Sequence, residues 1–111
     1  TVVLIPSERY PLLATDLYQV LDTSDLPGGV VNIVTGPRDA LAKVLAEHND
    51  VDAIWYFGSA EGSAMVERAS VGNLKQTWVS NGHGRNWLRE DSAEFLRHAT
   101  QVKNIWVPYG A

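Results

Sequence analysis

The stretch Val30-Val31-Asn32-Ile33-Val34-Thr35-Gly36-Pro37 decides the fold class. Its first five residues form an apolar run rich in β-branched side chains, which is typical of a strand buried on both faces of a parallel sheet. Thr35-Gly36 ends the strand, and Pro37 suits the first turn of a helix, where a missing N–H has no cost. Asp39, close to that start, complements the helix dipole. The stretch therefore predicts a strand, a tight turn and a helix.

The same alternation continues on both sides of this unit. Further strands are expected at 2–5, 53–57, 74–79 and 101–107. Amphipathic helices are expected with inward stripes formed by Leu13, Leu17, Val20 and Leu21 (ending near Asp25), by Leu41, Val44, Leu45 and His48 (ending near Asn49), and by Met65, Val66 and Ala69. Asp91 and Glu94 are spaced as a capping box for a short final helix through Arg97. Alternating strands and helices with short connections predict an α/β fold: a Rossmann-like parallel sheet with flanking helices, followed by a last strand at 101–107.

The composition excludes several classes of protein. A length of 111 residues suits one domain, or a piece of a larger enzyme. The net charge of −4 argues against a nucleic-acid partner, and no apolar stretch is long enough to span a membrane. The chain has no cysteine, so it has no disulfide, no thiolate metal site and no thiol nucleophile. Thr1 opens directly into a strand without a leader, which suggests that the natural chain starts earlier.

Several motifs together resemble the cofactor-binding half of the aldehyde dehydrogenase superfamily. The run 27–36 is similar to that family's "PPGVVNIVTG", 48–52 to "HxDVDK", 57–61 to "FTGSTE", 4–8 to "xKPAE" and 73–75 to "NLK". The tail 99–107 resembles the family's C-terminal strand "YxQVKxVWV", through which subunits pair. The resemblance implies a degenerate NAD-binding-type domain at 1–84, followed by a short helix and an oligomerisation-type strand at 85–111. This arrangement is similar to the truncated second aldehyde-dehydrogenase-like copy that one branch of the superfamily carries after a complete first copy.

The departures from the family pattern remove its chemistry. The family oxidises aldehydes by attack of a cysteine thiolate and passes hydride to NAD, and this chain has no cysteine. Where the family's "ELGG" has a carboxylate base, Ser80 stands here. Ile5 takes the place of the lysine that holds the adenosine ribose, and Arg38 and Ala42 replace two glycines beside the adenine. We therefore expect no catalytic residue and no metal site, and weak or absent NAD binding in this chain.

Five residues are candidates for whatever cofactor contact remains: Glu8, Gly36, Arg38, Gly58 and Ser59. Glu8 matches a ribose ligand, but a carboxylate that favours a helix start is an alternative. Ser59 matches a phosphate ligand, and it is also a good N-cap. Arg38 either crowds the adenine or reaches a phosphate. His83, between two glycines, lacks the partners that a metal site needs.

The tryptophans require a separate interpretation. Trp55 lies in an expected central strand and is assigned to the core. Trp78, Trp87 and Trp106 either cover the sheet within the chain or contact the rest of a larger protein.

Two hypotheses of different classes follow. The first is a non-catalytic scaffold of a larger NAD-dependent aldehyde dehydrogenase, which pairs with the catalytic copy through its C-terminal strand. The resemblance implies that this parent is cytoplasmic and a homodimer. The second is a regulatory domain that senses NAD or a phosphate. An independent enzyme would need a nucleophile and a base, and the sequence offers no such pair.

Overall fold

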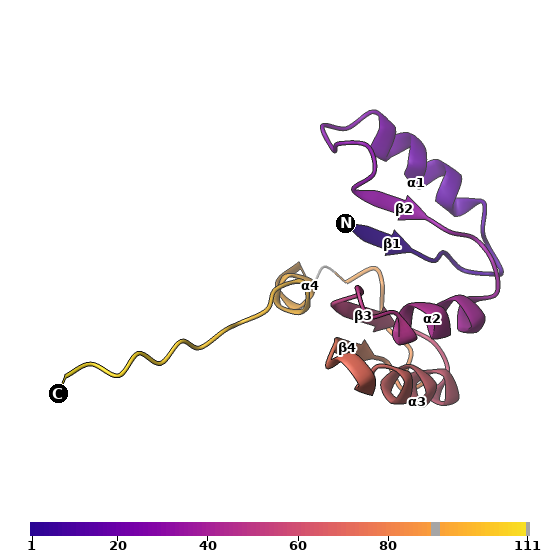
Figure 1. Cartoon of the computed structure of the whole chain (residues 1–111). Coiled ribbons are helices and arrows are strands. Elements are labelled where there is room, and N and C mark those ends of the chain that lie inside the picture. The colour runs from indigo at the N-terminus through magenta and orange to yellow at the C-terminus, as the bar shows by residue number, and fades with distance from the viewer. Residues whose placement is uncertain (90–91, 111) are drawn as a thin grey trace.

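The computed structural model describes residues 1–89 and 92–110, and up to its last helix it has the predicted order of strands and helices (Figure 1). The strands are β1 (Val2–Leu4), β2 (Val31–Ile33), β3 (Ala53–Tyr56) and β4 (Gln76–Val79). The helices are α1 (Leu13–Asp22), α2 (Arg38–Glu47), α3 (Ala60–Ala69) and α4 (Ser92–Ala99), with a 3₁₀ turn at Val71–Asn73. The α/β class is confirmed. Asp91, the expected cap of the last helix, lies outside the described residues.

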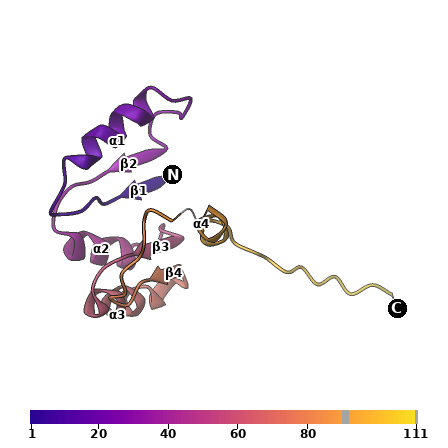
Figure 2. The same ribbon diagram turned by 180° about the vertical axis from the view of Figure 1, so that it is seen from behind.

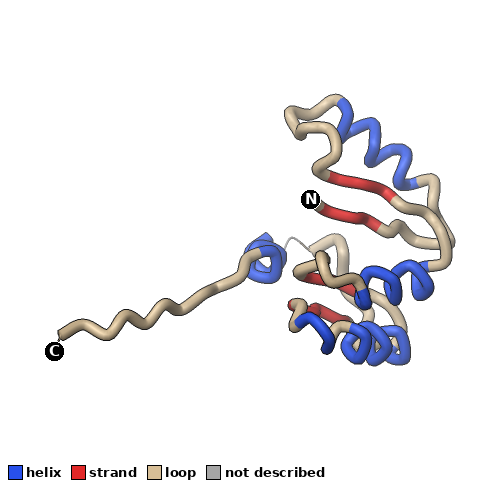
Figure 3. Tube along the Cα trace, viewed as in Figure 1, coloured by secondary structure: helices blue, strands red, loops and turns tan. Residues whose placement is uncertain are grey.

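The strands pair in parallel, as predicted, but in two separate ladders. Val2 to Leu4 pair with Val31 to Ile33, and Ala53 to Tyr56 pair with Gln76 to Val79. In both views of the ribbon the strands follow in the order β2, β1, β3, β4, and no ladder joins β1 to β3 (Figures 1 and 2). Figure 3 shows the same two pairs of strands. The structure therefore has the strand direction of a Rossmann-like sheet, divided at its middle.

Helices α2 and α3 cover one face of the β3–β4 ladder and form the core with it. The buried core residues are Ala42, Ala46, Ile54, Tyr56 and Val66. The predicted inward stripe of α2 is partly wrong, because Val44 is 62% exposed while the two alanines are buried. Small side chains on this stripe let α2 lie close to α3 and the sheet, so the alanines mark the packed face.

The opposite face of the β3–β4 ladder carries aromatic side chains and is covered by α4. Trp55 is 37% exposed and belongs to this face, so its assignment to the core was wrong. The reason is the alternation of side chains along a strand, which sends Ile54 and Tyr56 to the core and Trp55 away from it. We call the set on this second face the aromatic cluster; it consists of Trp55, Phe57, Trp78, Trp87 and Phe95. Trp78 and Trp87 thus cover the sheet within the chain.

Helix α1 exists but ends at Asp22, and its apolar stripe is not inward. Leu13, Leu17 and Val20 are exposed, and Ala14 is the one residue of the helix that is buried. The β1–β2 ladder has only two strands with three paired residues each, and this surface is too small to bury the apolar stripe of a ten-residue helix.

The C-terminal segment does not form a strand with the rest of the chain. Residues 101–110 are extended and project away from the body (Figures 1 and 2), and the last backbone hydrogen bond before the end joins Thr100 to Arg97. The predicted C-terminal strand therefore has no partner among the described residues, and its pairing stays a prediction. None of the helices described is long and apolar enough to cross a membrane.

Candidate functional site

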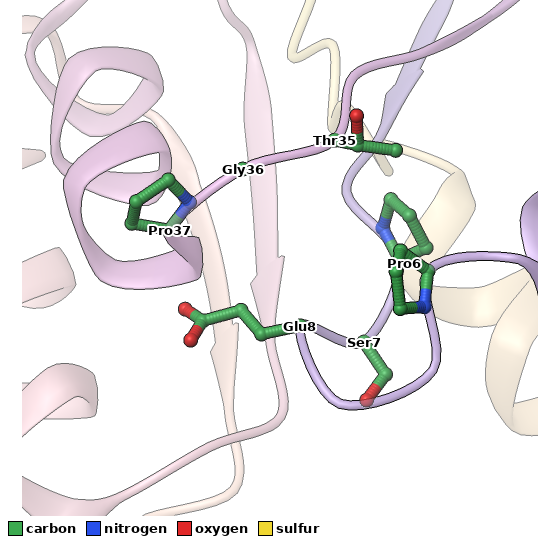
Figure 4. A pocket seen from close by; sticks show the side chains of 7 residues that line it. Pro6, Ser7, Glu8, Thr35, Gly36 and Pro37 are labelled. Carbon is green, nitrogen blue, oxygen red and sulfur yellow. The ribbon is translucent and has the colours of Figure 1, made fainter.

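The candidate residues lie at the carboxyl ends of the strands, where loops lead into the next helices. Glu8 follows β1, Gly36 follows β2, Arg38 begins α2, and Gly58 and Ser59 lead from β3 into α3. A pocket of about 330 Å³ opens between the first two of these loops (Figure 4). It is lined by Pro6, Ser7, Glu8, Pro11, Thr35, Gly36 and Pro37. The pocket brings Glu8 and Gly36 together and does not include Gly58 or Ser59.

Glu8 is engaged at the start of α2. Its Oε1 accepts a hydrogen bond from the backbone N–H of Arg38. The N-cap residue of this helix is Pro37, which offers no side-chain acceptor, so Glu8 supplies one from a loop thirty residues earlier. Figure 4 shows Glu8 reaching across from the β1 loop toward Pro37. Glu8 therefore acts as a carboxylate at a helix start, which was the alternative to a ribose ligand, and the helix is α2 rather than α1.

Arg38 belongs to a hydrogen-bonded network with Asp39 and Tyr56. Its Nε donates to Asp39 Oδ1 at 2.8 Å, and Tyr56 Oη donates to the same oxygen at 2.6 Å. The Arg38 guanidinium also lies over the Tyr56 ring, 5.1 Å from its centroid. We call this the Arg38–Asp39–Tyr56 network. The network connects the start of α2 to the end of β3, and in it the guanidinium contacts Asp39 and Tyr56 of the same chain.

The electrostatics of the network follow from these contacts. The Arg38 guanidinium, and after it the Tyr56 hydroxyl, hold the pKa of the Asp39 carboxyl below its ordinary value. The bond to Asp39 raises the pKa of Arg38. Burial, with the bond to Asp39, raises the pKa of Tyr56, so this hydroxyl is a donor and not a phenolate near neutral pH.

The Tyr56 side chain fills the space beside the first turn of α3. A Cβ built on Gly62 would lie 1.9 Å from Tyr56 Oη, and one built on Gly58 would lie 2.5 Å from it. Tyr56 is 3% exposed, so it has no room to give way. Glycine at these two positions is therefore needed to let the tyrosine reach Asp39.

Ser59 is the N-cap of α3, as the sequence predicted. Its Oγ accepts from the Gly62 N–H at 3.0 Å. Ser80, at the position of the family's base, donates from its Oγ to the Gly58 carbonyl at 3.2 Å. The His83 ring lies 3.0 Å from the Ser80 carbonyl oxygen. Within residues 1–89 and 92–110, no three potential metal ligands gather at one point.

The sequence did not predict the roles of two side chains, one buried and one half-buried. Lys75 is 8% exposed, and its Nζ donates to the carbonyls of Leu45 and His48 at 3.0 and 2.7 Å. The Asn73 amide donates to the same helix end, at His48 and Asn49. The "NLK" motif thus satisfies the last carbonyls of α2. A lysine inside the apolar strand expected at 74–79 was the available signal, but only the fold shows which carbonyls it meets.

The lowered pKa of Asp39 predicts a pH dependence. A carboxyl whose folded pKa lies below its unfolded one stabilises the fold above the ordinary value of 3.8 and loses this contribution as pH falls through the folded pKa. The stability difference between the native chain and Asp39→Asn is therefore expected to be constant near neutral pH and to shrink below about pH 4. Denaturant midpoints of both proteins across pH measure it; a difference that grows on acidification would contradict the network.

The fold and the site define a class: a parallel α/β domain with the candidate residues at the carboxyl ends of its strands. The sequence pattern described as "Aldehyde dehydrogenase family" matches residues 1–103. The chain is 39% identical over 83 residues to the "NADP/NAD-dependent aldehyde dehydrogenase PuuC" of Escherichia coli (strain K12), covering 74% of this chain and 17% of that protein. It is 36% identical over 104 residues to "Malonate-semialdehyde dehydrogenase 2" of Oceanobacillus iheyensis, covering 94% of this chain and 21% of that one.

A solved structure agrees with these relatives. The aldehyde dehydrogenase from Bartonella henselae superposes with a TM-score of 0.67 at 32% identity, over 71% of this chain and 17% of that one. The chain therefore belongs to the aldehyde dehydrogenase family. It spans about a fifth of the length of the curated relatives it matches.

Proposed function

We propose that this chain is a non-catalytic assembly module of a larger NAD-dependent aldehyde dehydrogenase. The observation that carries the proposal is the segment 101–107, which is extended and has no backbone partner in the described chain. Four of its residues are apolar and exposed: Val102, Ile105, Trp106 and Val107. A segment of this kind is suited to β-addition, in which main-chain hydrogen bonds join it to the edge of another sheet. The partners we propose are the catalytic copy of the same protein and a second copy of the chain, in the cytoplasm.

The chain's own residues do not supply the family's reaction. A thiolate attack needs a cysteine, and the chain has none. Ser80 donates its hydroxyl proton to the Gly58 carbonyl oxygen, which is not a base, so this hydrogen bond does not activate the hydroxyl as a nucleophile. In the proposed assembly, aldehyde oxidation belongs to the complete copy.

The residues present fit NAD poorly, which supports a role without the cofactor. A ribose would compete with the helix start for Glu8, and a phosphate would compete with Asp39 for Arg38. Tyr56 occupies the space beside the first turn of α3, between the starts of the two helices. Ile5 offers no charge in place of the lysine, and one lost charged hydrogen bond alone costs about 1.5–3 kcal/mol.

Deletion of residues 101–111 from the full-length parent tests the proposal. We expect self-association of the parent to weaken by about tenfold or more, which corresponds to about 1.4 kcal/mol or more of binding free energy. Activity should fall with assembly and not with the affinity for aldehyde. Sedimentation and steady-state kinetics of the same preparation give both values.

Deletion of residues 108–111 is the matched control, because it removes Pro108 and Tyr109 but keeps the strand-forming segment. This variant should assemble as the native parent does. If the longer deletion also leaves assembly and activity unchanged, the module has another role.

A further inference from the structure

A second hollow lies at the amino end of β4, whereas the candidate residues described above lie at the carboxyl ends of the strands. It measures about 350 Å³, and sites for small molecules commonly measure about 300–1,000 Å³. Leu74 and Gln76 line one side of the hollow, and residues from the end of α4 and the start of the tail line the other. The tail leaves the body of the protein at this point (Figures 1 and 2).

Four polar side chains of this hollow have no hydrogen-bond or ion-pair partner in the part of the chain that the structure describes. They are the side chains of Gln76, Arg97, His98 and Gln101. Together they offer a guanidinium, which is positive at every ordinary pH, two carboxamides and an imidazole. The described residues that line the hollow include no carboxylate. This set of donors suits an anion.

The carboxyl end of α4 opposes an anion, because the helix dipole places about half a negative charge there. Thr100 weakens this effect, since its hydroxyl donates to the carbonyls of Leu96 and Arg97 at 3.0 and 3.2 Å. Asp52, whose backbone carbonyl accepts from the Gln76 N–H, has a carboxylate that interacts with the Lys75 ammonium. The full positive charge of Arg97 therefore meets a dipole and a carboxylate that are both partly compensated.

His98 gives the hollow a planar wall. Its imidazole stacks on the Trp78 indole, with ring centroids 3.8 Å apart and an angle of 7° between the planes. Trp78 does not line the hollow, so the imidazole borders it with the surface that the indole leaves uncovered. Leu74 and Val102, which also line it, are 93% and 84% exposed and supply apolar surface. A flat ring can therefore stack on His98 between two apolar side chains.

We infer that this hollow binds a planar carboxylate, that is, a small acid whose negative charge is carried by a flat ring. Arg97 binds the carboxylate through two parallel hydrogen bonds, which is the geometry that a guanidinium favours. The ring stacks on His98, and the carboxamides of Gln76 and Gln101 donate to the remaining lone pairs of the ligand. The binding does not rest on the proposed function. Its meaning for the parent does, because oxidation of an aldehyde yields a carboxylate and the complete copy would release molecules of this class.

Titration of the 111-residue chain with three small molecules tests the inference. Benzoate has both the flat ring and the charge, benzamide has the ring without the charge, and cyclohexanecarboxylate has the charge without the flat ring. We expect a dissociation constant of about 1–10 mM for benzoate. Benzamide should bind about tenfold more weakly or worse, because the charged hydrogen bonds are lost. Cyclohexanecarboxylate should bind about two- to tenfold more weakly, because it cannot stack.

NMR spectra of the backbone amides locate the ligand. Benzoate should shift the amide signals of Gln76, His98 and Gln101 saturably and leave those of Gly58 and Ser59 unchanged. Fluorescence gives a second reading, because Trp78 lies directly behind His98.

Arg97→Gln should raise the dissociation constant of benzoate about tenfold or more. Arg68→Gln is the matched control and should leave the constant unchanged. Arg68 is also an exposed arginine in the last turn of a helix, α3, but it does not line the hollow. Equal affinities of the two variants would overturn the inference.

Two substitutions of His98 test the stacking. His98→Phe keeps a flat ring and should retain the preference for benzoate over cyclohexanecarboxylate, whereas His98→Leu should bind both equally. Near-ultraviolet dichroism like that of the native chain shows that α4 remains in place in both variants. A preference for benzoate that persists in His98→Leu would contradict the planar wall.

The location of the shifts separates failure of this inference from failure of the proposed function. If no amide responds saturably up to about 50 mM benzoate, the inference is wrong and the assembly module stands. If the responding amides are those of Gly58 and Ser59, the inference is also wrong. In that case an anion binds at the start of α3, which counts against a chain without a cofactor role.

Discussion

Replacing Trp78 with alanine is expected to lower the free energy of unfolding by about 3–5 kcal/mol, the range for a large aromatic side chain lost from a packed site. Trp78 is the centre of the aromatic cluster. Its ring lies 5.1 Å from those of Trp55 and Phe57 and 5.4 Å from that of Phe95, all edge-on, and it stacks on His98 at 3.8 Å. The Arg85 guanidinium lies 5.1 Å from it. Two side chains of α4, Phe95 and His98, contact this ring.

Denaturant unfolding followed by circular dichroism measures the loss. Leu88→Ala is the control, since Leu88 is fully exposed in the loop before α4 and its removal should change stability by less than about 0.5 kcal/mol. Near-ultraviolet dichroism should also weaken strongly for Trp78→Ala. Equal losses for the two variants would mean that α4 is not held by the aromatic cluster.

Replacing Lys75 with methionine is expected to lower the free energy of unfolding by about 2–3 kcal/mol, because two carbonyls at the end of α2 lose a charged donor. Burial lowers the pKa of Lys75, and the Asp52 carboxylate opposes the shift. The substitution also removes the cost of burying a charge. The expected loss of unfolding free energy is therefore smaller than the sum of two charged hydrogen bonds.

Lys43→Met is the matched control. Lys43 lies on α2, the helix whose end Lys75 contacts. It is exposed, and its Nζ is 3.8 Å from Glu47 Oε1, a surface pair worth less than about 1 kcal/mol. The midpoint of thermal unfolding should therefore fall for Lys75→Met and stay nearly constant for Lys43→Met. If Lys75→Met were as stable as the native chain, the helix end would have another source of donors.

The sequence predicted the positions of the strands and helices well, and it predicted which of their side chains are buried less well. The β-branched runs at Val2, Val30 and Ala53 placed three strands, because a parallel sheet demands apolar side chains on both faces. Their boundaries shifted by one or two residues where a turn competes; Leu74 adopts a left-handed backbone with φ of 56° after the 3₁₀ turn, so β4 starts at Gln76. Periodicity identified α1 as a helix but did not reveal that the ladder beneath it is too narrow to bury its stripe.

The candidate site shows the same division between local and long-range information. The capping role of Ser59 is local, and three residues of sequence suffice to predict it. The bond from Glu8 to Arg38 and the bond from Tyr56 to Asp39 join residues thirty and seventeen positions apart. Neither follows from spacing along the chain, because each depends on how two loops meet at the ends of neighbouring strands. The family motif predicted a ribose contact at Glu8, and Arg38, which departs from the motif, was expected either to crowd the adenine or to reach a phosphate. Only the fold reveals the internal partners of both residues.

Titration of the isolated 111-residue chain with NAD, followed by calorimetry and by tryptophan quenching, tests the central claim most directly. If Glu8, Arg38 and Tyr56 are committed to contacts within the protein, no saturable binding should occur up to millimolar cofactor, which corresponds to a binding free energy weaker than about −4 kcal/mol. Saturable binding in the micromolar range, abolished by Ser59→Asp, would contradict the account. The chain would then be a cofactor-sensing domain and not an assembly module alone.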